Sequence, residues 1–447
     1  MKTKTAFERL GLFDARVPRY TSYPPATQFS DQVGPRDIRN WITKIAPGTK
    51  ISLYLHIPFC RRLCWFCACR TQGTTTLAPL AHYMQTLATE LDLLRQNLPD
   101  SVRLGRVHWG GGTPTLLDSD MIDELAEHVR AVGPFADDAE FSVEIDPNEI
   151  DQARVTALAK AGMTRASIGV QDFDPMIQEV IGREQSFEVT QAAVDMLRVA
   201  GVDSLNTDIL FGLPHQTQER ITASINKLLS LGPDRVALYG YAHVPWVARR
   251  QNLIPSDALP TPRERLDLFE VARKLLTWDG YREIGIDHFA LPDDGLAQAQ
   301  ANDTLKRNFQ GYTDDQSEVL IGVGASSISR FPQGYAQNAP STSRYHSAVE
   351  GGDFATVRGH KFTAEDRIRG PIIEALMCRF EISVHDAPDN ADVVRALIRG
   401  AQARFGDAVH VSEDRLVIRP EARALTRVIA RHFDTYEVEA GRHASAI

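Results

Sequence analysis

Three cysteines, Cys60, Cys64 and Cys67, are the residues of this chain whose type and spacing point most directly to chemistry. Three residues separate the first two cysteines, and two residues separate the second and third. Thiolates this close together on a loop can converge on one cubane iron-sulfur cluster, and three of them leave the fourth iron without a protein ligand. An iron with an open coordination position can bind a substrate or a further cofactor.

Other uses of these thiols fit the sequence less well. A structural zinc site needs four ligands, usually as two separated pairs, and the chain has no second pair. We expect a cytoplasmic protein, because the first nine residues lack the apolar stretch of a signal peptide, and cytosolic thiols stay reduced. Ordinary buried thiols are the remaining alternative, which is hard to reconcile with four of the five cysteines lying within ten positions.

The elements that must position these residues follow a regular pattern. From residue 51 onward, short β-branched runs alternate with longer helical patterns, which predicts repeated βα units around a parallel sheet. Six or seven units are too few for a closed eight-stranded barrel, so we predict an α/β fold with a partial (β/α)6-type barrel. The predicted strands are 51–56, 106–109, 141–146, 165–170, 204–211, 235–241 and 281–288, and the predicted helices are 80–96, 120–132, 151–161, 187–200, 218–231 and 262–278.

Polar residues or glycines follow four of these predicted strands. Because barrels of this kind carry their chemistry on the loops after the strands, we expect these residues to meet at one rim. The glycine run at 110–112, taken alone, indicates only a tight turn. Glu144 and Asp208 suit hydrogen bonding to ammonium or ribose hydroxyl groups, and capping of a helix N-terminus stays open as their alternative role. His56 and His108 are close in sequence to these segments, and we assign neither a role.

The composition sets limits on partners. The chain has 447 residues, 43% hydrophobic and 24% charged, which predicts a soluble globular protein of two or three domains without a membrane span. The net charge of -9 argues against nucleic acid as the main partner. Residues 1–50 hold nine Lys and Arg against four acids, so this arm carries +5 and the rest of the chain -14. The basic arm could dock on the acidic body, bind an anionic substrate, or be a solvated surface only.

We divide the chain into three parts: a basic N-terminal arm (1–49), a partial-barrel domain (50–360) and a small, mainly helical C-terminal domain (361–447). In the last part we predict helices at 364–379, 391–405 and 421–432 and a hairpin at 409–411 and 416–418, a pattern typical of winged-helix domains. On an acidic chain this pattern favours a lid or scaffold over DNA binding. We expect a monomer, because no long apolar stripe is evident.

The cysteine loop, which follows a short apolar strand, resembles the signature of the radical S-adenosylmethionine (SAM) enzymes. This resemblance implies a 4Fe-4S cluster with three cysteine ligands, whose open iron binds SAM and whose electron cleaves SAM to a 5′-deoxyadenosyl radical. It also implies a partial barrel, in agreement with the strand pattern.

Several further segments, taken in order, resemble the oxygen-independent coproporphyrinogen III oxidase family. That family converts two propionates of coproporphyrinogen III to vinyl groups in haem synthesis without oxygen. The resemblance implies hydrogen abstraction from the propionate β-carbon, loss of carbon dioxide, and transfer of one electron to an acceptor; neither the electron donor nor the acceptor is identified by the sequence. The segments are 19–24 (RYTSYP), 60–69 with the extra Cys69, 169–173 (GVQDF), 208–214 (DILFGLP), 241–243 (YAH) and 307–312 (RNFQGY).

The resemblance also implies a set of site residues. Two SAM molecules are expected. Cys69 and Tyr54 are the catalytic candidates, and Arg19, Tyr20 and Tyr23 of the arm are expected to reach the substrate. The family usually has glycine where Ala68 stands, a change that matters only if this position needs a positive φ. The contacts implied for the first SAM are Tyr54, Phe66, Gly111, Glu144 and Ile328, and those for the second are Gly112, Thr113, Gln171, Arg183, Asp208 and Ala242.

Rival functions share the same superfamily signature. A haem-binding chaperone keeps the three-cysteine loop, but it typically lacks the fourth cysteine and the basic arm, which are both present here. A methyltransferase or a haem-degrading enzyme is not excluded by the cysteine loop; the arm and the segment 307–312 argue against it. A purely structural iron-sulfur protein is disfavoured by the open coordination position.

Overall fold

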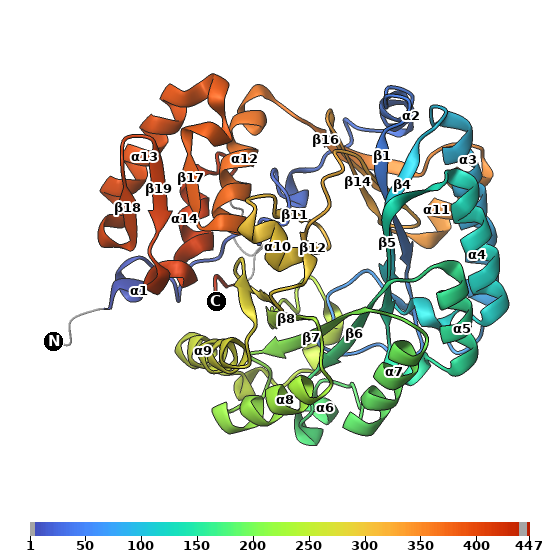
Figure 1. The fold of residues 1–447 in the computed structure, drawn as a ribbon, viewed down its shortest axis with the longest axis horizontal. Helices are drawn as coiled ribbons and strands as arrows, with labels where there is room; N and C mark the ends of the chain where they lie inside the picture. Colours follow the sequence, from blue (N-terminus) through green and yellow to red (C-terminus); the bar gives the residue numbers. More distant parts are fainter. Residues whose placement is uncertain (1–4, 438–444) are drawn as a thin grey trace.

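A twelve-stranded sheet forms the body of the protein (Figure 1). The computed structural model describes residues 5–437 and 445–447. The strands follow the order β16-β15-β14-β13-β1-β4-β5-β6-β7-β8-β10-β9. Among the described helices, none is both long and apolar enough to cross a membrane.

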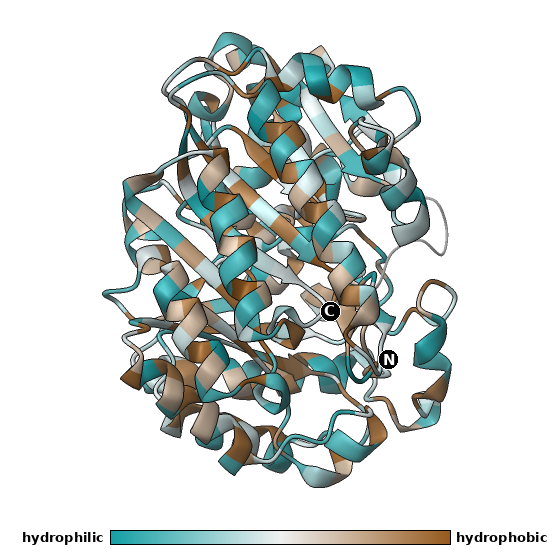
Figure 2. Ribbon diagram, turned by 90° about the vertical axis from the view of Figure 1, so that its right-hand side faces the viewer, coloured by the Kyte–Doolittle hydropathy of each residue, from teal (hydrophilic) through white to brown (hydrophobic). Residues whose placement is uncertain are grey.

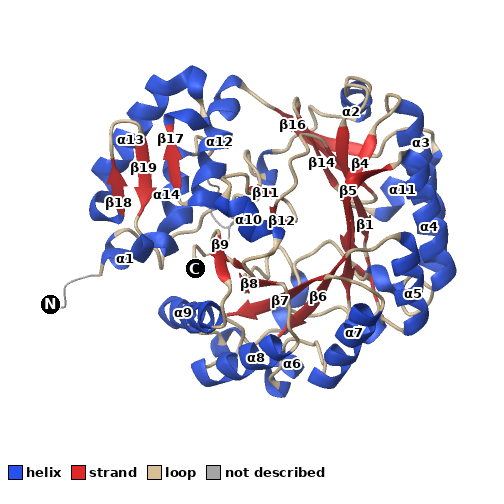
Figure 3. Ribbon diagram, viewed as in Figure 1, coloured by secondary structure: helices blue, strands red, loops and turns tan. Residues whose placement is uncertain are grey.

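Six consecutive parallel strands and their outer helices confirm the predicted partial barrel. Each connection between neighbouring strands contains at least one helix, and the helices cover the outer face of the sheet (Figure 3). The strands are β1 (Lys50–Ile57), β4 (Arg103–Gly111), β5 (Phe135–Ile145), β6 (Arg165–Gln171), β7 (Ser204–Phe211) and β8 (Arg235–Gly240). The helices are α3 (Ala78–Asn97), α4 (Ser119–Val132), α5 (Gln152–Ala161), α6 (Pro175–Val180), α7 (Phe187–Val199) and α8 (Gln218–Ser230), with α9 (Pro262–Trp278) after the last strand.

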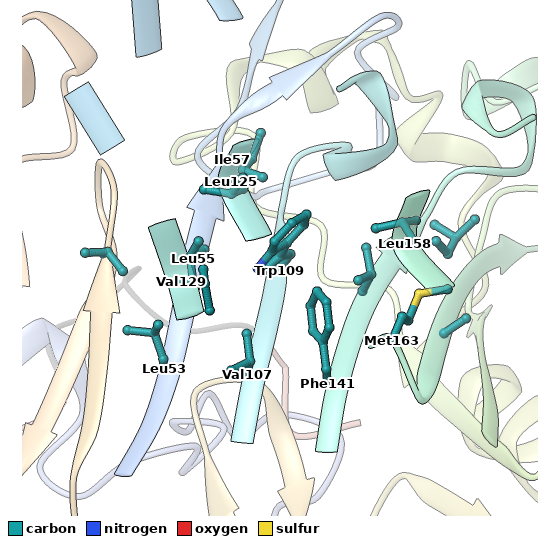
Figure 4. Packing of buried hydrophobic residues seen from close by; sticks show 14 of the residues in the cluster. Leu53, Leu55, Ile57, Val107, Trp109, Leu125, Val129, Phe141, Leu158 and Met163 are labelled. Atoms are coloured by element: carbon teal, nitrogen blue, oxygen red, sulfur yellow. The ribbon is translucent and has the colours of Figure 1, made fainter. Parts of the chain in front are cut away.

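Side-chain alternation along the strands explains which residues face the helices. In β1, Leu53, Leu55 and Ile57 are fully buried in the core between the sheet and the helices (Figure 4). Successive residues of a strand point to opposite faces. Tyr54 and His56 therefore face the inner side of the barrel, where polar side chains can be used for binding.

Two parts of the sheet differ from the prediction. The single strand predicted at 281–288 is wrong: Gly285 takes a positive φ of 54° and turns the chain, which gives an antiparallel pair, β9 (Arg282–Ile284) and β10 (His288–Ala290). The sequence also gave no expectation for the sheet beyond β1. There β13 (Leu320–Val323) pairs with β1 in parallel, and β14 (Ile328–Phe331), β15 (Gly334–Asn338) and β16 (Thr356–Lys361) extend the sheet antiparallel.

The C-terminal part forms a second core beside the barrel. It contains the predicted α12 (Ala364–Arg379), α13 (Ala391–Phe405) and hairpin, with α14 (Thr426–Phe433) preceded by a 3-10 turn rather than one continuous helix. The hairpin strands β18 (Val409–Val411) and β19 (Arg415–Ile418) form a three-stranded sheet with β17 (Glu381–Ser383).

The N-terminal arm is divided between the two cores. Leu12, Val17, Tyr20 and Tyr23 are buried with the C-terminal helices, whereas the next helix of the arm, α2 (Pro35–Ile42), buries its apolar face in the barrel core. The arm and the C-terminal part also lie side by side in Figure 1, where α1 (Ala6–Arg9) is next to α14. The basic arm is thus part of the folded body rather than a free tail.

Buried ion pairs line the inner face of the strands at their N-terminal ends. Arg165 of β6 lies 2.5 Å from Glu140 of β5, and Arg235 of β8 lies 2.6 Å from Asp294. Burial raises the pKa of Glu140, but the charge and hydrogen bond of Arg165 outweigh it and lower this pKa to about 2. Charges removed from water are tolerated in proteins when they are paired in this way.

We predict that Glu140→Gln destabilises the fold by about 3 kcal/mol at pH 7, because it leaves Arg165 buried beside a neutral partner. Since the folded pKa of Glu140 lies below its unfolded value, its contribution is complete above the unfolded pKa of 4.5 and is lost as the pH falls towards about 2. Urea unfolding at pH 7 and pH 3.5 measures both effects, and the gap between the two proteins should narrow at the lower pH. An equal gap at both pH values would contradict this account.

Candidate active site

The three predicted cluster cysteines lie on one loop after β1. Cys60 ends the short strand β2 (Phe59–Cys60), and Cys64 and Cys67 follow before β3 (Gln72–Gly73). All three thiols therefore follow the C-terminal end of β1 on one short stretch of chain.

The environments of the thiols differ. Hydrogen bonding with Cys69 is the main reason why the pKa of Cys67 falls to about 6. The backbone N–H of Cys69 also donates to the Cys67 sulfur, at 3.4 Å. Burial raises the pKa of Cys60 to about 11. Cys69, which is exposed, is thus placed to modulate the Cys67 sulfur.

A buried glutamine that the sequence did not reveal holds the cysteine loop to the barrel. The Gln251 side chain donates to the carbonyl oxygens of Phe66, at 2.7 Å, and Ala242, at 3.0 Å. Its own side-chain oxygen accepts from the Val244 N–H at 2.6 Å. One side chain therefore joins two segments that were predicted to contact different SAM molecules. The long separation in sequence, 185 residues between Gln251 and Phe66, explains why no local pattern indicated it.

The glycine run fits against the cysteine loop so closely that side chains are excluded. At Gly111, where φ is 109°, a Cβ atom would lie 2.5 Å from the His56 ring. At Gly112, a Cβ atom would lie 2.5 Å from the Phe59 carbonyl oxygen, just before Cys60. The Gly112 N–H donates to the carbonyl oxygen of Ile57 at 2.8 Å. The run is therefore required by close approach as well as by the turn.

Glu144 lies at the centre of a polar network that includes both histidines left without a role. One carboxylate oxygen accepts from the Gly111 N–H at 3.0 Å, and the other lies 3.4 Å from Nε2 of His108. The Tyr54 hydroxyl pairs with Nδ1 of His56 at 2.9 Å, and its ring stacks on His108. Burial raises the pKa of Glu144, but the hydrogen bond and charge of His108 outweigh it, so the net shift is downward.

The residues predicted for the second SAM lie at the next strand ends. Arg183 donates to the Gly169 carbonyl oxygen at 2.8 Å and lies 3.5 Å from the Cys64 sulfur. A Cβ atom at Gly169 would lie 3.1 Å from the side chains of both Arg183 and Gln171, which therefore converge there. Asp208 accepts from Asn206 at 2.9 Å, and burial raises its pKa to about 6.

The remaining predicted residues are also near this rim. Thr113 forms a hydrogen bond with Cys60. Ile328 lies near Tyr54. Gly322 pairs with Tyr54 in the sheet, and a Cβ atom at Gly322 would lie 2.7 Å from the Ile328 carbonyl oxygen. Ala68 has no positive φ, so alanine is compatible with the loop.

A large cavity opens beside this rim, between the barrel, the arm and the C-terminal core. Its volume is about 710 Å³, and its wall contains aromatic and positively charged side chains. Arg19 of the arm lines it, whereas Tyr20 and Tyr23 point into the C-terminal core, where their hydroxyls contact Asp434 and Thr435. Lining residues from the three parts include Arg19, Phe211, Tyr239, Ala242, Arg265 and Arg427.

Comparison with known proteins identifies the family. A family model for the radical SAM superfamily matches residues 54–228. The oxygen-independent coproporphyrinogen III oxidase of Paracoccus denitrificans is 60% identical over 100% of both chains. This chain belongs to the oxygen-independent coproporphyrinogen III oxidase family.

Other members of this family support the assignment over the full chain. The protein of the same name from Cereibacter sphaeroides is 56% identical over 98% of each chain. The structure of the Escherichia coli coproporphyrinogen III oxidase, described as a radical SAM enzyme, superposes with a TM-score of 0.89 at 35% identity, covering 95% of this chain and 100% of that one. The family fold therefore includes the arm and the C-terminal part as well as the barrel.

We predict that Gly112→Ala destabilises this family member by about 1–3 kcal/mol, because the added methyl group would meet backbone atoms of the cysteine loop. Thermal unfolding should show a lower melting temperature, and less iron should be retained after cluster reconstitution. Gly34→Ala is the matched control, since no atom lies within 4 Å of a Cβ there and its φ of -132° suits alanine. Equal melting temperatures for both variants would contradict the prediction.

Proposed function

We propose that this protein converts two propionate side chains of coproporphyrinogen III to vinyl groups without oxygen, giving protoporphyrinogen IX. The observation that carries this proposal is the cavity of about 710 Å³ with arginines in its wall, whose lining residue Ala242 is joined through Gln251 to the loop of Cys60, Cys64 and Cys67. A porphyrinogen with four carboxylates matches a large, partly aromatic and basic cavity. The full-length similarity to enzymes of this name supports the same reaction.

We assign the cluster and SAM to the residues named from the family resemblance. Cys60, Cys64 and Cys67 would hold a 4Fe-4S cluster with one open iron. When bound, the cluster and SAM supply a 5′-deoxyadenosyl radical. Each propionate then loses one hydrogen atom from its β-carbon, one molecule of carbon dioxide and one electron, and becomes a vinyl group. The chain itself binds, orients and shields the reactants.

The first SAM would meet the Glu144 network. The ionised carboxylate of Glu144 is suited to accept hydrogen bonds from the SAM ammonium group, and the Gly111 backbone permits close approach. Burial raises the pKa of Tyr54 well above its usual value, so this catalytic candidate stays a neutral hydroxyl. Phe66 and Ile328 would add apolar contacts at the same position.

The second SAM would lie between β4 and β8. Asp208 would accept hydrogen bonds from ribose hydroxyls, and Arg183 would pair with the SAM carboxylate, since its Nε atom is buried without a partner among the described residues. Gln171 lies next to Arg183 at the Gly169 backbone. Gly112, Thr113 and Ala242 would complete the contacts.

We propose that the three parts of the chain have separate tasks. Residues 50–360 would carry the chemistry, while residues 1–49 and 361–447 would close the substrate cavity. The protein would act as a monomer in the cytoplasm and exchange electrons with a donor and an acceptor.

The test is an anaerobic assay of the reconstituted protein with SAM, a strong reductant and coproporphyrinogen III. Mass spectrometry should show loss of two carboxyl groups from the porphyrinogen, together with 5′-deoxyadenosine. Single serine variants of Cys60, Cys64 and Cys67 should lose iron and turnover together, because each removes a ligand.

Two controls make the assay specific. Cys69→Ala should keep the iron but lose turnover, and Cys378→Ala, which changes a buried thiol of α12, should keep both. Tight haem binding with an unchanged porphyrinogen would instead support the haem-chaperone alternative and contradict the proposed reaction.

A further inference from the structure

Two arginines from distant parts of the chain meet at the backbone of Gly240, at the end of β8. Arg19 of the arm donates through Nη2 to the Gly240 carbonyl oxygen at 2.9 Å. Nη2 of Arg265 also approaches this residue and lies 3.2 Å from the position that a Gly240 Cβ atom would take. Both guanidinium groups line the large cavity, and the Gly240 that they approach lies two residues before Ala242. They are therefore close to the proposed cofactor rim.

Most other arginines of the cavity wall are already neutralised or fully engaged. Arg273 pairs with Glu270 at 2.8 Å, Arg307 with Asp287 at 3.5 Å, and Arg423 with Glu283 at 3.4 Å. Arg427 has no such pair, but its guanidinium donates to four backbone oxygens, those of Val17, Pro18, Ser445 and Ala446.

Arg19 and Arg265 differ from Arg273, Arg307 and Arg423, because neither pairs with an Asp or Glu side chain within the described ranges 5–437 and 445–447. Arg16, which also lacks such a pair there, lies over the Trp246 ring at 5.5 Å. Among the residues that the structure describes, Arg265 donates to an oxygen of Ile447, at 3.1 Å, and to the Gly212 carbonyl oxygen, at 3.4 Å. Burial, together with the charge of Arg19, lowers the pKa of Arg265 to about 10. Two like charges held together in a partly buried wall repel each other.

We propose that Arg19 and Arg265 form one subsite that binds a propionate carboxylate of the porphyrinogen. This inference rests on the proposed function and adds the residues that recognise the substrate. A carboxylate can accept hydrogen bonds from two guanidinium groups, and such charge-assisted bonds are stronger than the present bond of Arg19 to the neutral carbonyl oxygen of Gly240. A bound carboxylate would therefore compete with the Ile447 oxygen for Arg265 and would reduce the repulsion between the two arginines.

The position of Arg19 is fixed by its neighbours rather than by the subsite itself. Tyr20 donates to Asp434 at 2.9 Å, and Arg427 donates to the carbonyl oxygens of Val17 and Pro18. These bonds hold the arm against the C-terminal core while the Arg19 side chain extends to the barrel. Removal of the whole arm would disturb that core, so single side-chain changes are the appropriate test.

The experiment uses the cluster-loaded full chain without oxygen and compares R19Q, R265Q, the double variant and R265K with the unchanged protein. Fluorescence quenching gives the Kd for coproporphyrin III, an unreactive tetracarboxylate, and turnover gives the KM for coproporphyrinogen III. R19Q and R265Q should each raise both constants by about 10-fold. The double variant should raise them by less than the product of the single effects, because both arginines bind the same carboxylate.

R265K should fall between R265Q and the unchanged protein, since lysine keeps the charge but loses the planar pair of donors. The matched control is R273Q, on the same helix and cavity but paired with Glu270, which should change both constants by less than about twofold. Iron content, melting temperature and SAM affinity should be unchanged in all variants, which separates carboxylate binding from a structural role.

Constants within twofold of the unchanged protein for R19Q and R265Q, with turnover intact, would overturn the subsite and leave the proposed function standing. Fully multiplicative effects in the double variant would also overturn it, because they would indicate two separate carboxylates. Failure of the unchanged protein to bind coproporphyrin III or to convert coproporphyrinogen III would overturn the proposed function itself.

Discussion

A parallel strand sends successive side chains to opposite faces of its sheet, and here that alternation separates a dry core from a polar inner face. Leu53, Leu55 and Ile57 anchor β1 against the helices, and this burial fixes Tyr54 and His56 on the inner side. The same alternation in β5 buries Val143 and Ile145 and leaves Glu144 facing the site. A shift of one residue in any of these strands would exchange the two sets, so the register of the sheet determines the site.

Inside the barrel, polar groups are arranged so that few charges stand alone. At the N-terminal ends of the strands, arginines and carboxylates neutralise one another, as in the pair of Arg165 and Glu140. At the opposite rim, carboxylates such as Glu144 and Asp208 are held by neutral donors and histidines instead. The first arrangement stabilises the fold, whereas the second leaves hydrogen-bonding capacity for ligands.

The sequence predicted those features that depend on local patterns. The cysteine spacing, the glycine run and the repeated βα units are each visible within a short window, and the structure confirms the units and brings the predicted residues to one rim. The prediction of one strand at 281–288 was wrong, because the apolar pattern continues through a turn that Gly285 makes. Gln251 and Arg265 could not be found, since their partners lie 185 and 182 residues away in the chain and are brought close only by the packing of distant segments.

The division of the arm between two cores has a mechanical consequence. The chain passes between the barrel core and the C-terminal core twice, once in the arm and once after β16, and these two passages are joined where Ser30 and Gly359 exchange backbone hydrogen bonds of 2.8 Å. This isolated bridge ties the two passages to each other, so the arm and the segment that leads into α12 cannot shift independently. Because the cavity walls come from both parts, this connection also sets the separation of those walls.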